Sequence, residues 1–510
     1  MSYTLRIASR KSDLARLQSV HVAQLLESYW RSHGQELKIE FQFSESLGDR
    51  NLNDPLWKMP EKGVFTSDLS QGLLENRYDL VVHSWKDLPL EADSQVLGTP
   101  PREDPRDLIL FRKELLQEIL PTSTLVVLSS SPRRAYNLEP FLKEYLPHAP
   151  KLIRFESVRG NIPTRLQKLT GPISAGNLGA HALVVAKAAI DRLLDPPTPE
   201  FHAVRDQIRS MLQHCEQMTV PLSLNPPAPA QGALALEVRT GDSSTERWVS
   251  PILCAKSTHE VRLERRELAR FGGGCHQKIG SSFHTLEHGI VHTLRGVSSA
   301  GEVLQARELL SEGSRSPVRG ELKHYWSTQL CNITLFDREP IPETLQKVLD
   351  SREGRFYVSH PDALPETLKP ESFRHGPPAL WCSGRMTWLE LARRGFWVRG
   401  CDDALGERVP EGYTKLGHQD SPELGPGWAT YRLTPRDTSD LKKAWQLEQK
   451  THFFWRSISQ FERVSQSCPE ILEAHHACGP GSTARWLKSK VKRLEVCLDE
   501  TDWRRRHGIQ

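Results

Sequence analysis

The feature that most constrains the fold of this chain is a repeated alternation of short apolar strands and amphipathic helices. Leu5–Ser9 reads as a buried strand, and the apolar residues of Asp13–Trp30 recur at helical spacing. Ser123–Ser130 and His181–Leu194 repeat the pattern. The alternation lasts for about 240 residues, which predicts doubly wound α/β domains with parallel sheets. Ligands of such sheets bind at the carboxyl ends of the strands.

The pattern changes near residue 250. A charged amphipathic helix is predicted over Ser257–Phe271, and three strands joined by short turns follow it up to Leu310. We expect a small α+β domain there, closed by a helix over Arg319–Leu330, with Phe336–Glu343 as a linker. Beyond the linker, strands and helices alternate again. The predicted domains are an α/β domain of residues 1–110 with 218–245, an α/β domain of 111–217, an α+β domain of 246–332 and a C-terminal α/β domain of 345–510.

The composition is that of a globular chain and excludes several classes of protein. The 510 residues carry a net charge of +4, which is too small to indicate nucleic acid binding but compatible with a local basic cleft for an anion. No apolar run is long enough to span a membrane and the N-terminus lacks a signal core, so we expect a cytoplasmic protein. The nine cysteines form no C-x-x-C pair, and His475–Cys478 lacks partner ligands, so no metal site or disulfide framework is predicted.

Arginines that follow predicted strands are the strongest sign of a binding site. Arg10 follows the first strand, and Arg133 and Arg134 follow the strand that ends near Ser131. The planar guanidinium group suits carboxylate or phosphate, so a set of this kind could hold a ligand with many acidic groups. The same residues could instead form a solvated basic face. The other arginines of the set are Arg159, Arg165 and Arg192.

A second sign is the stretch VVHSWKDLP, Val81–Pro89, in which an apolar strand ends in Ser84, Lys86 and Asp87. A carboxylate there can protonate a leaving amine, accept from N–H donors or stabilise a developing cation. A neighbouring lysine would keep that carboxylate ionised. The alternative is an ordinary turn from strand to loop. His83 is a single histidine at a strand end, and we expect it to be structural.

Two further stretches are ambiguous when taken alone. Ser129–Ser131 could donate to an anion at a helix N-terminus or could simply cap that helix. The glycines of FGGGC, Phe271–Cys275, favour a loose or tightly turned backbone. Cys275 is then either an inert small residue or a thiol held out for chemistry.

Together these stretches resemble the porphobilinogen deaminase family, whose members are also called hydroxymethylbilane synthases. The resemblance covers residues 1 to about 332 and rests on LRIASRKSDLARLQ, EKGVF, LLENRYDLVVHSWKDLP, REDPRD, SSSPRRAYNL, VRGNIPTRL, PAPAQGALALE and GGGC, in the family's order. It implies two doubly wound α/β domains of the periplasmic-binding-protein kind and a small α+β domain that anchors a cofactor. It also implies a transferase that joins four porphobilinogen molecules into hydroxymethylbilane in haem biosynthesis and releases ammonia each time. We expect a monomer with neither a nucleic acid nor a membrane partner.

The resemblance assigns roles to individual residues. Cys275 matches the cysteine that carries a dipyrromethane cofactor through a thioether, and Asp87 matches the catalytic aspartate. By resemblance, Asp87 assists loss of the amine and stabilises the azafulvenium cation. The implied cofactor-binding residues are Cys275, Ser84, Lys86, Asp87, Ser130, Ser131, Arg133, Arg134 and Arg159, and the implied substrate-binding residues are Arg10, Gln18, Arg165 and Arg192.

The sequence departs from the family's pattern at several positions. Pro132 follows the serines where the family has leucine, and Ser67 stands in place of a lysine soon after KGVF. Asn53 replaces an aspartate, and Lys278 replaces the proline that follows the cofactor cysteine. None of these changes removes the cysteine, the aspartate or the arginines, so they bear on efficiency and loop motion.

The C-terminal region resembles the second domain of uroporphyrinogen-III synthase. The likeness rests on ALWCSGRMTWLELARRGFWV, FFWRSISQFERV and HHACGPGSTARWL. That family has two domains with a cleft between them, and the first is poorly represented here. The region is therefore either a fused, truncated or degenerate cyclising domain, or a structural or partner-binding appendage.

Two other classes of function remain for the N-terminal part. A non-catalytic module could capture small anions between two doubly wound domains, although that reading leaves GGGC and the pair Lys86 and Asp87 unexplained. An RNA-binding or polyanion-binding surface would require exposed aromatic side chains among the arginines, and few are present.

Overall fold

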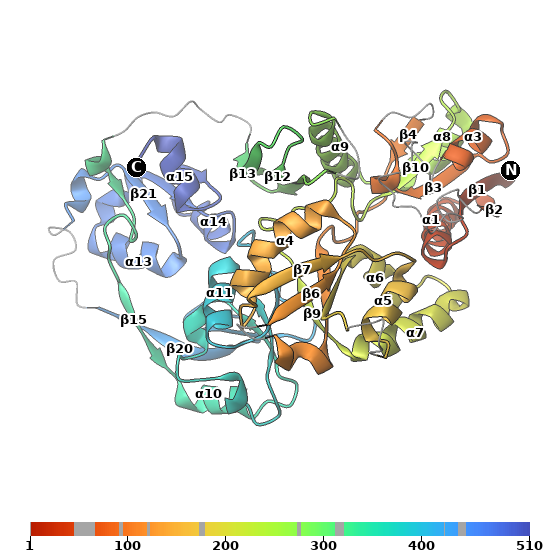
Figure 1. Cartoon of the computed structure of the whole chain (residues 1–510). Coiled ribbons are helices and arrows are strands. Elements are labelled where there is room, and N and C mark those ends of the chain that lie inside the picture. Colours follow the sequence, from red (N-terminus) through yellow and green to blue (C-terminus); the bar gives the residue numbers. More distant parts are fainter. Residues whose placement is uncertain are drawn as a thin grey trace. The chain divides into compact units, whose positions relative to one another are not determined.

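The structure is a computed structural model of the whole chain (Figure 1). It describes residues 2–44, 67–90, 95–119, 123–172, 179–272, 277–311, 321–422, 424–436 and 445–509. The chain divides into two compact units. The first unit consists of Met1–Lys143, Ala149–Thr285 and Thr293–Ala306, and the second of Glu144–His148, Leu286–His292 and Arg307–Gln510. None of the helices in the described residues is both long and apolar enough to cross a membrane.

The first unit contains two five-stranded sheets with the same design. The strand order of one is β2 (Glu36–Ser44), β1 (Ser2–Arg10), β3 (Leu80–Ser84), β10 (Leu234–Val238) and β4 (Gln95–Gly98). The order of the other is β7 (Leu152–Glu156), β6 (Thr124–Leu128), β8 (Ala182–Ala186), β5 (Asp107–Arg112) and β9 (Cys215–Thr219). In each sheet the fourth strand alone runs antiparallel to its neighbours.

The antiparallel strands mark the places where the chain passes between the two sheets. It leaves the first sheet after β4 and enters the second as β5, and it leaves the second after β9 and returns as β10. Both β5 and β10 are buried at every residue, as expected for strands covered on both faces. Two α/β domains linked by a double crossing form the periplasmic-binding-protein architecture, so the predicted fold class is confirmed.

Helices cover both sheets in the positions that the sequence predicts (Figure 1). In the first sheet the helices are α1 (Asp13–Ser32), α3 (Ser67–Leu74) and α8 (Ser243–Val249). In the second they are α4 (Pro132–Tyr145), α5 (Ile162–Thr170), α6 (Lys187–Leu194) and α7 (His202–Gln213). Val22, Ala23 and Leu26 of α1 are buried in the core of the first sheet, so the apolar spacing seen in the sequence is the face that packs on the sheet.

The predicted charged helix and three strands are also present. They are α9 (Ala255–Ala269), β11 (Gly280–Leu286), β12 (Gly289–Val297) and β13 (Val303–Leu310), and the strands form one three-stranded sheet. Glu264 of α9 is fully buried and receives two hydrogen bonds from Arg102, at 2.7 and 2.8 Å. The backbone N–H of Ala230 donates to the same carboxylate at 2.7 Å. This ion pair fixes α9 to the segments that connect the two larger sheets.

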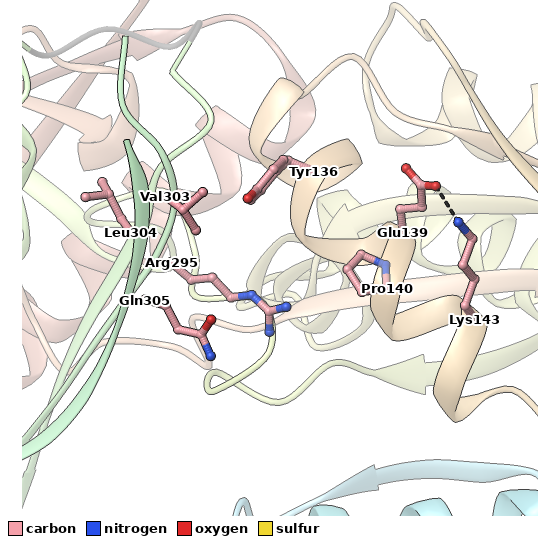
Figure 2. Close-up of a pocket in the computed structure, with 8 residues that line it drawn as sticks. All are labelled: Tyr136, Glu139, Pro140, Lys143, Arg295, Val303, Leu304 and Gln305. Atoms are coloured by element: carbon pink, nitrogen blue, oxygen red, sulfur yellow. Dashed lines mark hydrogen bonds and ion pairs between the residues drawn. The ribbon is translucent and has the colours of Figure 1, made fainter. Parts of the chain in front are cut away.

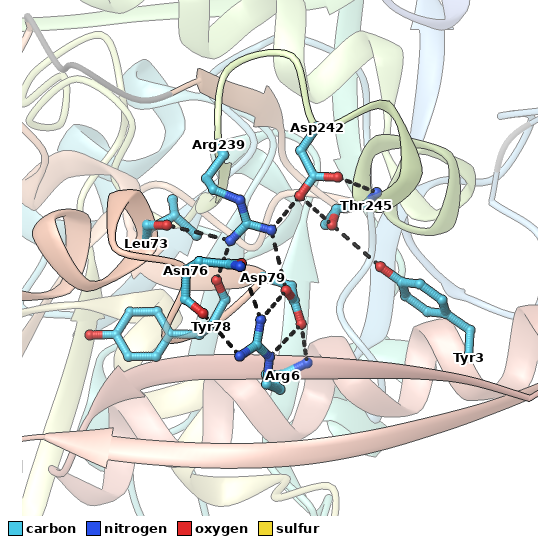
Figure 3. A network of polar contacts seen from close by, with 9 residues as sticks. All are labelled: Tyr3, Arg6, Leu73, Asn76, Tyr78, Asp79, Arg239, Asp242 and Thr245. Atoms are coloured by element: carbon cyan, nitrogen blue, oxygen red, sulfur yellow. Dashed lines mark hydrogen bonds and ion pairs between the residues drawn. The ribbon is translucent and has the colours of Figure 1, made fainter.

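Some arginines of the first sheet are purely structural. Figure 3 shows Arg6 and Arg239 on either side of Asp79, to which they donate at 2.7 and 3.3 Å. Burial alone would raise the pKa of Asp79, but the hydrogen bonds from Arg6 hold it below its usual value. Arg239 also donates to the carbonyl oxygen of Tyr78 at 2.5 Å. The network joins β1, the start of β3 and the end of β10.

The second unit contains two parallel sheets. Six strands lie in the order β15 (Phe336–Pro340), β20 (Trp428–Pro435), β19 (Thr414–His418), β16 (Arg355–Val358), β17 (Ala379–Cys382) and β18 (Val398–Cys401), with α10 (Pro342–Leu349) and α11 (Arg385–Arg393). Four strands lie in the order β14 (Tyr325–Trp326), β21 (His452–Trp455), β22 (His475–Cys478) and β23 (Leu494–Val496), with α13 (Ile458–Ser467), α14 (Ser482–Leu487) and α15 (Glu500–His507). Only β15 is antiparallel to its neighbour.

The C-terminal region differs from expectation at its start. The helix predicted over Arg319–Leu330 is wrong, because Tyr325 and Trp326 form a strand that pairs with β21. Both side chains are buried, Tyr325 against Trp503 of α15 and Trp326 against Trp455 of β21, and this packing overrides the helical spacing. The expected linker Phe336–Glu343 contains β15 and the first turn of α10. Strands of this region therefore begin at Tyr325, before residue 345 where the C-terminal domain was expected to start, and they form two sheets.

Candidate active site

Asp87 lies in a short turn at the carboxyl end of β3. A 3₁₀ helix, Trp85–Asp87, follows Ser84, the last residue of the strand. The indole of Trp85 is buried among small apolar residues, and its backbone N–H donates to Ala233 at 3.0 Å. Arg265 of α9 donates to the carbonyl oxygens of Trp85 and Leu88 at 3.3 and 3.2 Å. The turn is held from two sides, which fixes where Asp87 is presented.

Lys86 connects this turn to the segment before β10. Its Nζ donates to Oε1 of Gln231 at 3.4 Å. The amide nitrogen of Gln231 in turn donates to Oδ1 of Asp107 at 2.9 Å and to the carbonyl oxygen of Pro105 at 2.8 Å. Gln231 and Asp107 stand on the two segments by which the chain passes between the sheets. The lysine next to Asp87 is thus linked through one amide to both crossings.

Asp107, the first residue of β5, is the carboxylate at the centre of the site. Four side-chain donors bind it: Arg134 at 2.6 Å, Arg133 at 2.8 Å, Asn225 at 2.8 Å and Gln231 at 2.9 Å. Burial alone would raise the pKa of Asp107, but the charges of Arg133 and Arg134 hold it well below its usual value. The two arginines predicted to bind an anion are therefore held, side by side, by an anion of the protein itself.

Several positive charges surround this carboxylate. Burial lowers the pKa of Lys86, and Arg134 and Arg133 lower it further, while Asp87 and Asp107 oppose them. Burial also lowers the pKa of Arg165, with Arg134 and Arg159 adding to the effect and Asp87 opposing it. Cations that depress one another's pKa are close in space. Lys86, Arg133, Arg134, Arg159 and Arg165 therefore belong to one electrostatic cluster with Asp87 and Asp107.

The remaining predicted binding residues lie at the end of β1 and in the helices α1, α5 and α6. Arg192 of α6 donates to the carbonyl oxygen of Gly232 at 2.7 Å, and burial lowers its pKa to about 10. Arg10 is the last residue of β1. Gln18 is buried in α1 and is 4% exposed. Arg165 is positioned by the hydrogen bond from its Nε to the carbonyl oxygen of Gly160, at 2.8 Å.

The serines occupy the loops around α4. The hydroxyl of Ser130 donates to the carbonyl oxygen of Val158 at 2.7 Å and accepts from the backbone N–H of the same residue at 2.9 Å. Ser131 accepts weakly from the N–H of Arg134 at 3.4 Å, near the start of the helix. Ser84 pairs with Leu234 across the β3–β10 ladder. These contacts shape the loops, so they support the helix-capping interpretation as much as a ligand contact.

The positions at which the sequence departs from the pattern fall into three groups. Pro132 is the first residue of α4, where proline is favoured because its missing N–H would have no helical partner. Lys278 has an exposed side chain, so it fits where it stands without a buried charge. Asn53 lies outside the described residues, as does the side chain of Ser67. Cys275, which matches the family's pattern, also lies outside them.

Sequence reasoning missed the residues that organise the site. Asp107, Asn225 and Gln231 hold the predicted cations, and none was assigned a role. Asp107 and Gln231 lie in REDPRD and PAPAQGALALE, two stretches that had been noted only as motifs. The available signal was their position, since Asp107 directly precedes the apolar run Leu108–Phe111 and Gln231 lies just before the apolar stretch that begins at Ala233. His83 was expected to be structural, and its Nε2 lies 2.7 Å from the buried carboxylate of Glu237.

A cavity of about 320 Å³ lies elsewhere in the first unit (Figure 2). Helix α4 contributes Tyr136, Pro140 and the ion pair of Glu139 with Lys143, whose atoms lie 2.7 Å apart. Strands β12 and β13 contribute the other wall, which includes Arg295. None of the predicted site residues lines this cavity.

Comparison with known proteins identifies the N-terminal part. The family model for the porphobilinogen deaminase dipyrromethane cofactor-binding domain matches residues 5–247. A probable porphobilinogen deaminase from Methanopyrus kandleri is 32% identical over 334 residues, which are 61% of this chain and 100% of the relative. The porphobilinogen deaminase of Syntrophobacter fumaroxidans is 31% identical over 61% of this chain and 96% of its own length.

A third relative and a solved structure complete the comparison. The porphobilinogen deaminase of Thermus thermophilus is 30% identical over 62% of this chain and 88% of its own length. A solved YaeC-family lipoprotein from Enterococcus faecalis covers 52% of this chain and 96% of its own at 10% identity, but its TM-score of 0.26 is too low to bear on the fold. The chain therefore belongs to the porphobilinogen deaminase family of transferases, which hold a dipyrromethane cofactor.

Proposed function

We propose that this chain condenses four porphobilinogen molecules into hydroxymethylbilane and releases ammonia at each addition, as a step of haem biosynthesis. The observation that carries the proposal is the position of Asp87 beside several cations, of which Lys86 and Arg165 interact with it directly. The substrate has acidic side chains, which the cations can bind. It also has a basic amine, whose departure the carboxyl group of Asp87 can assist. Few sites in a protein combine both requirements within one turn of chain.

Asp87 is the residue that faces the reacting atoms in this proposal. Loss of the amine from porphobilinogen leaves a cation that is conjugated with the pyrrole nitrogen. A fixed carboxylate stabilises such a cation and accepts from the pyrrole N–H. The turn held by Trp85 and Arg265 keeps Asp87 in place before the charge develops.

The side chains around Asp107 fit a group with several carboxylates. Nε of Arg133 and Nε of Arg134 are buried without a hydrogen-bond partner in the described residues. Beside burial, neighbouring cations of the cluster lower the pKa values of Lys86, Arg133 and Arg165, so an acidic ligand would relieve their repulsion. Lys86, Arg133, Arg134 and Arg159 would hold the carboxylates of dipyrromethane, with the thiol of Cys275 as its covalent anchor. The cofactor supplies a fixed first acceptor for the growing chain.

The activity is tested by incubating the purified full-length protein with porphobilinogen. We expect ammonia and hydroxymethylbilane in a ratio of about four to one, as the proposed stoichiometry requires. Saturable binding of porphobilinogen without release of ammonia would instead identify the non-catalytic anion-binding module.

We propose a second activity for the C-terminal region, that of uroporphyrinogen-III synthase. The observation that favours it is the presence of two parallel sheets, because the family that this region resembles has two domains. Formation of the type III isomer from porphobilinogen by the full chain would support the activity. Accumulation of the uncyclised bilane would leave the region as a structural appendage.

We further propose that the protein acts in the cytoplasm as a monomer, without nucleic acid or membrane.

A further inference from the structure

The six-stranded sheet of the second unit reverses its strand order at one point. The chain begins its parallel part with β16, adds β17 and β18 on one side, and then returns to add β19 and β20 on the other. The reversal therefore lies between β16 and β19. In open parallel sheets, ligands bind beyond the carboxyl ends of the strands at such a point. The residues found there are Ser359 and His360, which follow β16, and His418, which ends β19.

Two buried polar atoms at this edge have no partner among the described residues. They are Oγ of Ser359 and Nδ1 of His418. Buried polar atoms are nearly always hydrogen-bonded, and an exception calls for a water or a ligand. The lack of a partner for these two atoms among the described residues is an observation independent of the strand order. Both observations indicate a site for a molecule with hydrogen-bonding groups.

The same edge carries a cation and two imidazoles. Nε of Arg338, on β15, lies 3.4 Å from a carboxylate oxygen of Asp362, and Nδ1 of His360 lies 3.6 Å from the same oxygen. The ring of Tyr431 lies near both imidazoles, with centroid distances of 6.4 Å to His360 and 5.9 Å to His418. Arg338, both histidines and the tyrosine thus belong to one cluster.

Both imidazoles are uncharged at neutral pH. Burial, aided by Arg338, lowers the pKa of His360 to about 4, and burial also lowers the pKa of His418. Nδ1 of His360 accepts from the backbone N–H of Asp362 at 3.2 Å, so the proton of this ring is on Nε2. A neutral ring with its proton there is a hydrogen-bond donor that does not repel Arg338.

We propose that the carboxyl ends of β16 and β19 form a binding site for a carboxylate of an organic acid. Arg338 supplies the charge, and His360 and His418 supply hydrogen bonds. Asp362 occupies the place of the ligand's carboxylate in the free protein, at a distance longer than that of a close ion pair. Only the identity of the natural ligand rests on the proposed synthase activity, because the bilane made by the first unit would carry two carboxylates per ring.

The site is tested in the full chain by protection of histidines from diethyl pyrocarbonate. The probe is uroporphyrin I, a stable octacarboxylate, and inorganic phosphate at the same concentration is the comparison. Peptide mass spectrometry measures modification of His360, His418 and, as an exposed reference, His375. We expect uroporphyrin I to protect His360 and His418 but not His375, and phosphate to protect neither. Protection by phosphate alone, or equal modification with and without uroporphyrin I, would overturn the proposal.

Three variants show whether the named residues form the site. Arg338→Gln should weaken the protection about tenfold, because a charge-assisted hydrogen bond is lost. Asp362→Asn should strengthen it, because the competing carboxylate is removed. Arg432→Gln is the matched control, since Arg432 lies on the partner strand of the same ladder and donates to Gln419. Protection that is unchanged by both Arg338→Gln and Asp362→Asn would contradict the assignment, and circular dichroism confirms that each variant is folded.

The isomer of the product separates this proposal from the synthase activity. If uroporphyrin I protects the histidines but no type III isomer forms, the binding site stands and the synthase activity fails. If the type III isomer forms equally in the wild type and in Arg338→Gln, with no protection, the synthase activity stands and the binding site fails.

Discussion

Arg134 donates to Oδ1 of Asp107 at 2.6 Å, and Asp107 is the residue at which the chain enters the second sheet. One of the arginines expected to bind an acidic ligand therefore pairs with a carboxylate on the segment that links the two sheets. Arg133 occupies the other oxygen of the same carboxylate at 2.8 Å. The pairing couples the site to the backbone that links the sheets.

Removing the central carboxylate should destabilise the fold. Asp107→Ala leaves two buried guanidinium groups without their anion, for which we expect a loss of about 3–5 kcal/mol in the free energy of unfolding. Urea denaturation followed by tryptophan fluorescence measures it. Asp206→Ala, at an exposed aspartate of α7, should change the free energy by less than about 0.5 kcal/mol. Equal effects of the two changes on the free energy of unfolding would show that the pairing of Asp107 with the arginines adds no more stability than an exposed aspartate does.

The same carboxylate should make stability depend on pH in acid. Its pKa is lowered in the folded protein, so the unfolded chain binds a proton first as the pH falls below about 5. The stabilising contribution is therefore complete at neutral pH and shrinks as the pH falls. We expect the difference in unfolding free energy between the wild type and Asp107→Asn to stay constant from pH 7 to about pH 5 and to decrease from there to pH 3. A constant difference over this range would contradict the assigned ionisation.

Asp87 should matter for turnover and not for folding. Its side chain is partly exposed and the turn is held by Trp85 and Arg265, so Asp87→Ala should fold normally. We expect the release of ammonia from porphobilinogen to fall by at least about a thousandfold, as when a group that stabilises transition-state charge is removed. Asp206→Ala serves again as the control. Near-normal turnover would remove Asp87 from its proposed role.

Gly232 should be intolerant of any side chain. Its φ is +87°, and a Cβ atom would lie 2.7 Å from the carbonyl oxygen of Glu103. Gly241 has a similar φ of +80° with open space around it, so Gly241→Ala isolates the cost of the backbone conformation. We expect Gly232→Ala to cost more than Gly241→Ala in thermal unfolding. It should also raise KM, because the carbonyl oxygen of Gly232 positions Arg192.

The sequence predicted the elements of the first unit well because each has a strong local signal. Apolar runs such as Val81–Ser84 coincide with buried strands, and the apolar face of α1 is the face that packs. A local apolar pattern in the sequence could not predict that β10 is the antiparallel fourth strand of the first sheet. That position depends on pairing between Leu234 and Ser84, which are far apart along the chain. The same limit applies to Tyr325 and Trp326, whose strand pairs with β21 across more than a hundred residues.

The sequence predicted which charged residues belong to the site but not how they are held together. The sequence pointed to Lys86, Asp87 and Arg165 because each follows a strand, although Arg165 follows a strand of the second sheet and its proximity to Asp87 depends on how the two sheets are joined. The role of Asp107 was hidden, because an aspartate at the start of a strand is common and its four partners come from three distant segments. The place of Cys275 remains a prediction from the resemblance, since this residue lies outside the described part of the chain.

The central claim is that the first unit is a deaminase with its cofactor fixed to Cys275. Intact-mass measurement of the purified protein tests it most directly. We expect a covalent dipyrromethane adduct that maps to the peptide with Cys275 and is absent from Cys275→Ser, which should also release no ammonia from porphobilinogen. An unmodified wild-type protein, or equal turnover by Cys275→Ser, would contradict the account.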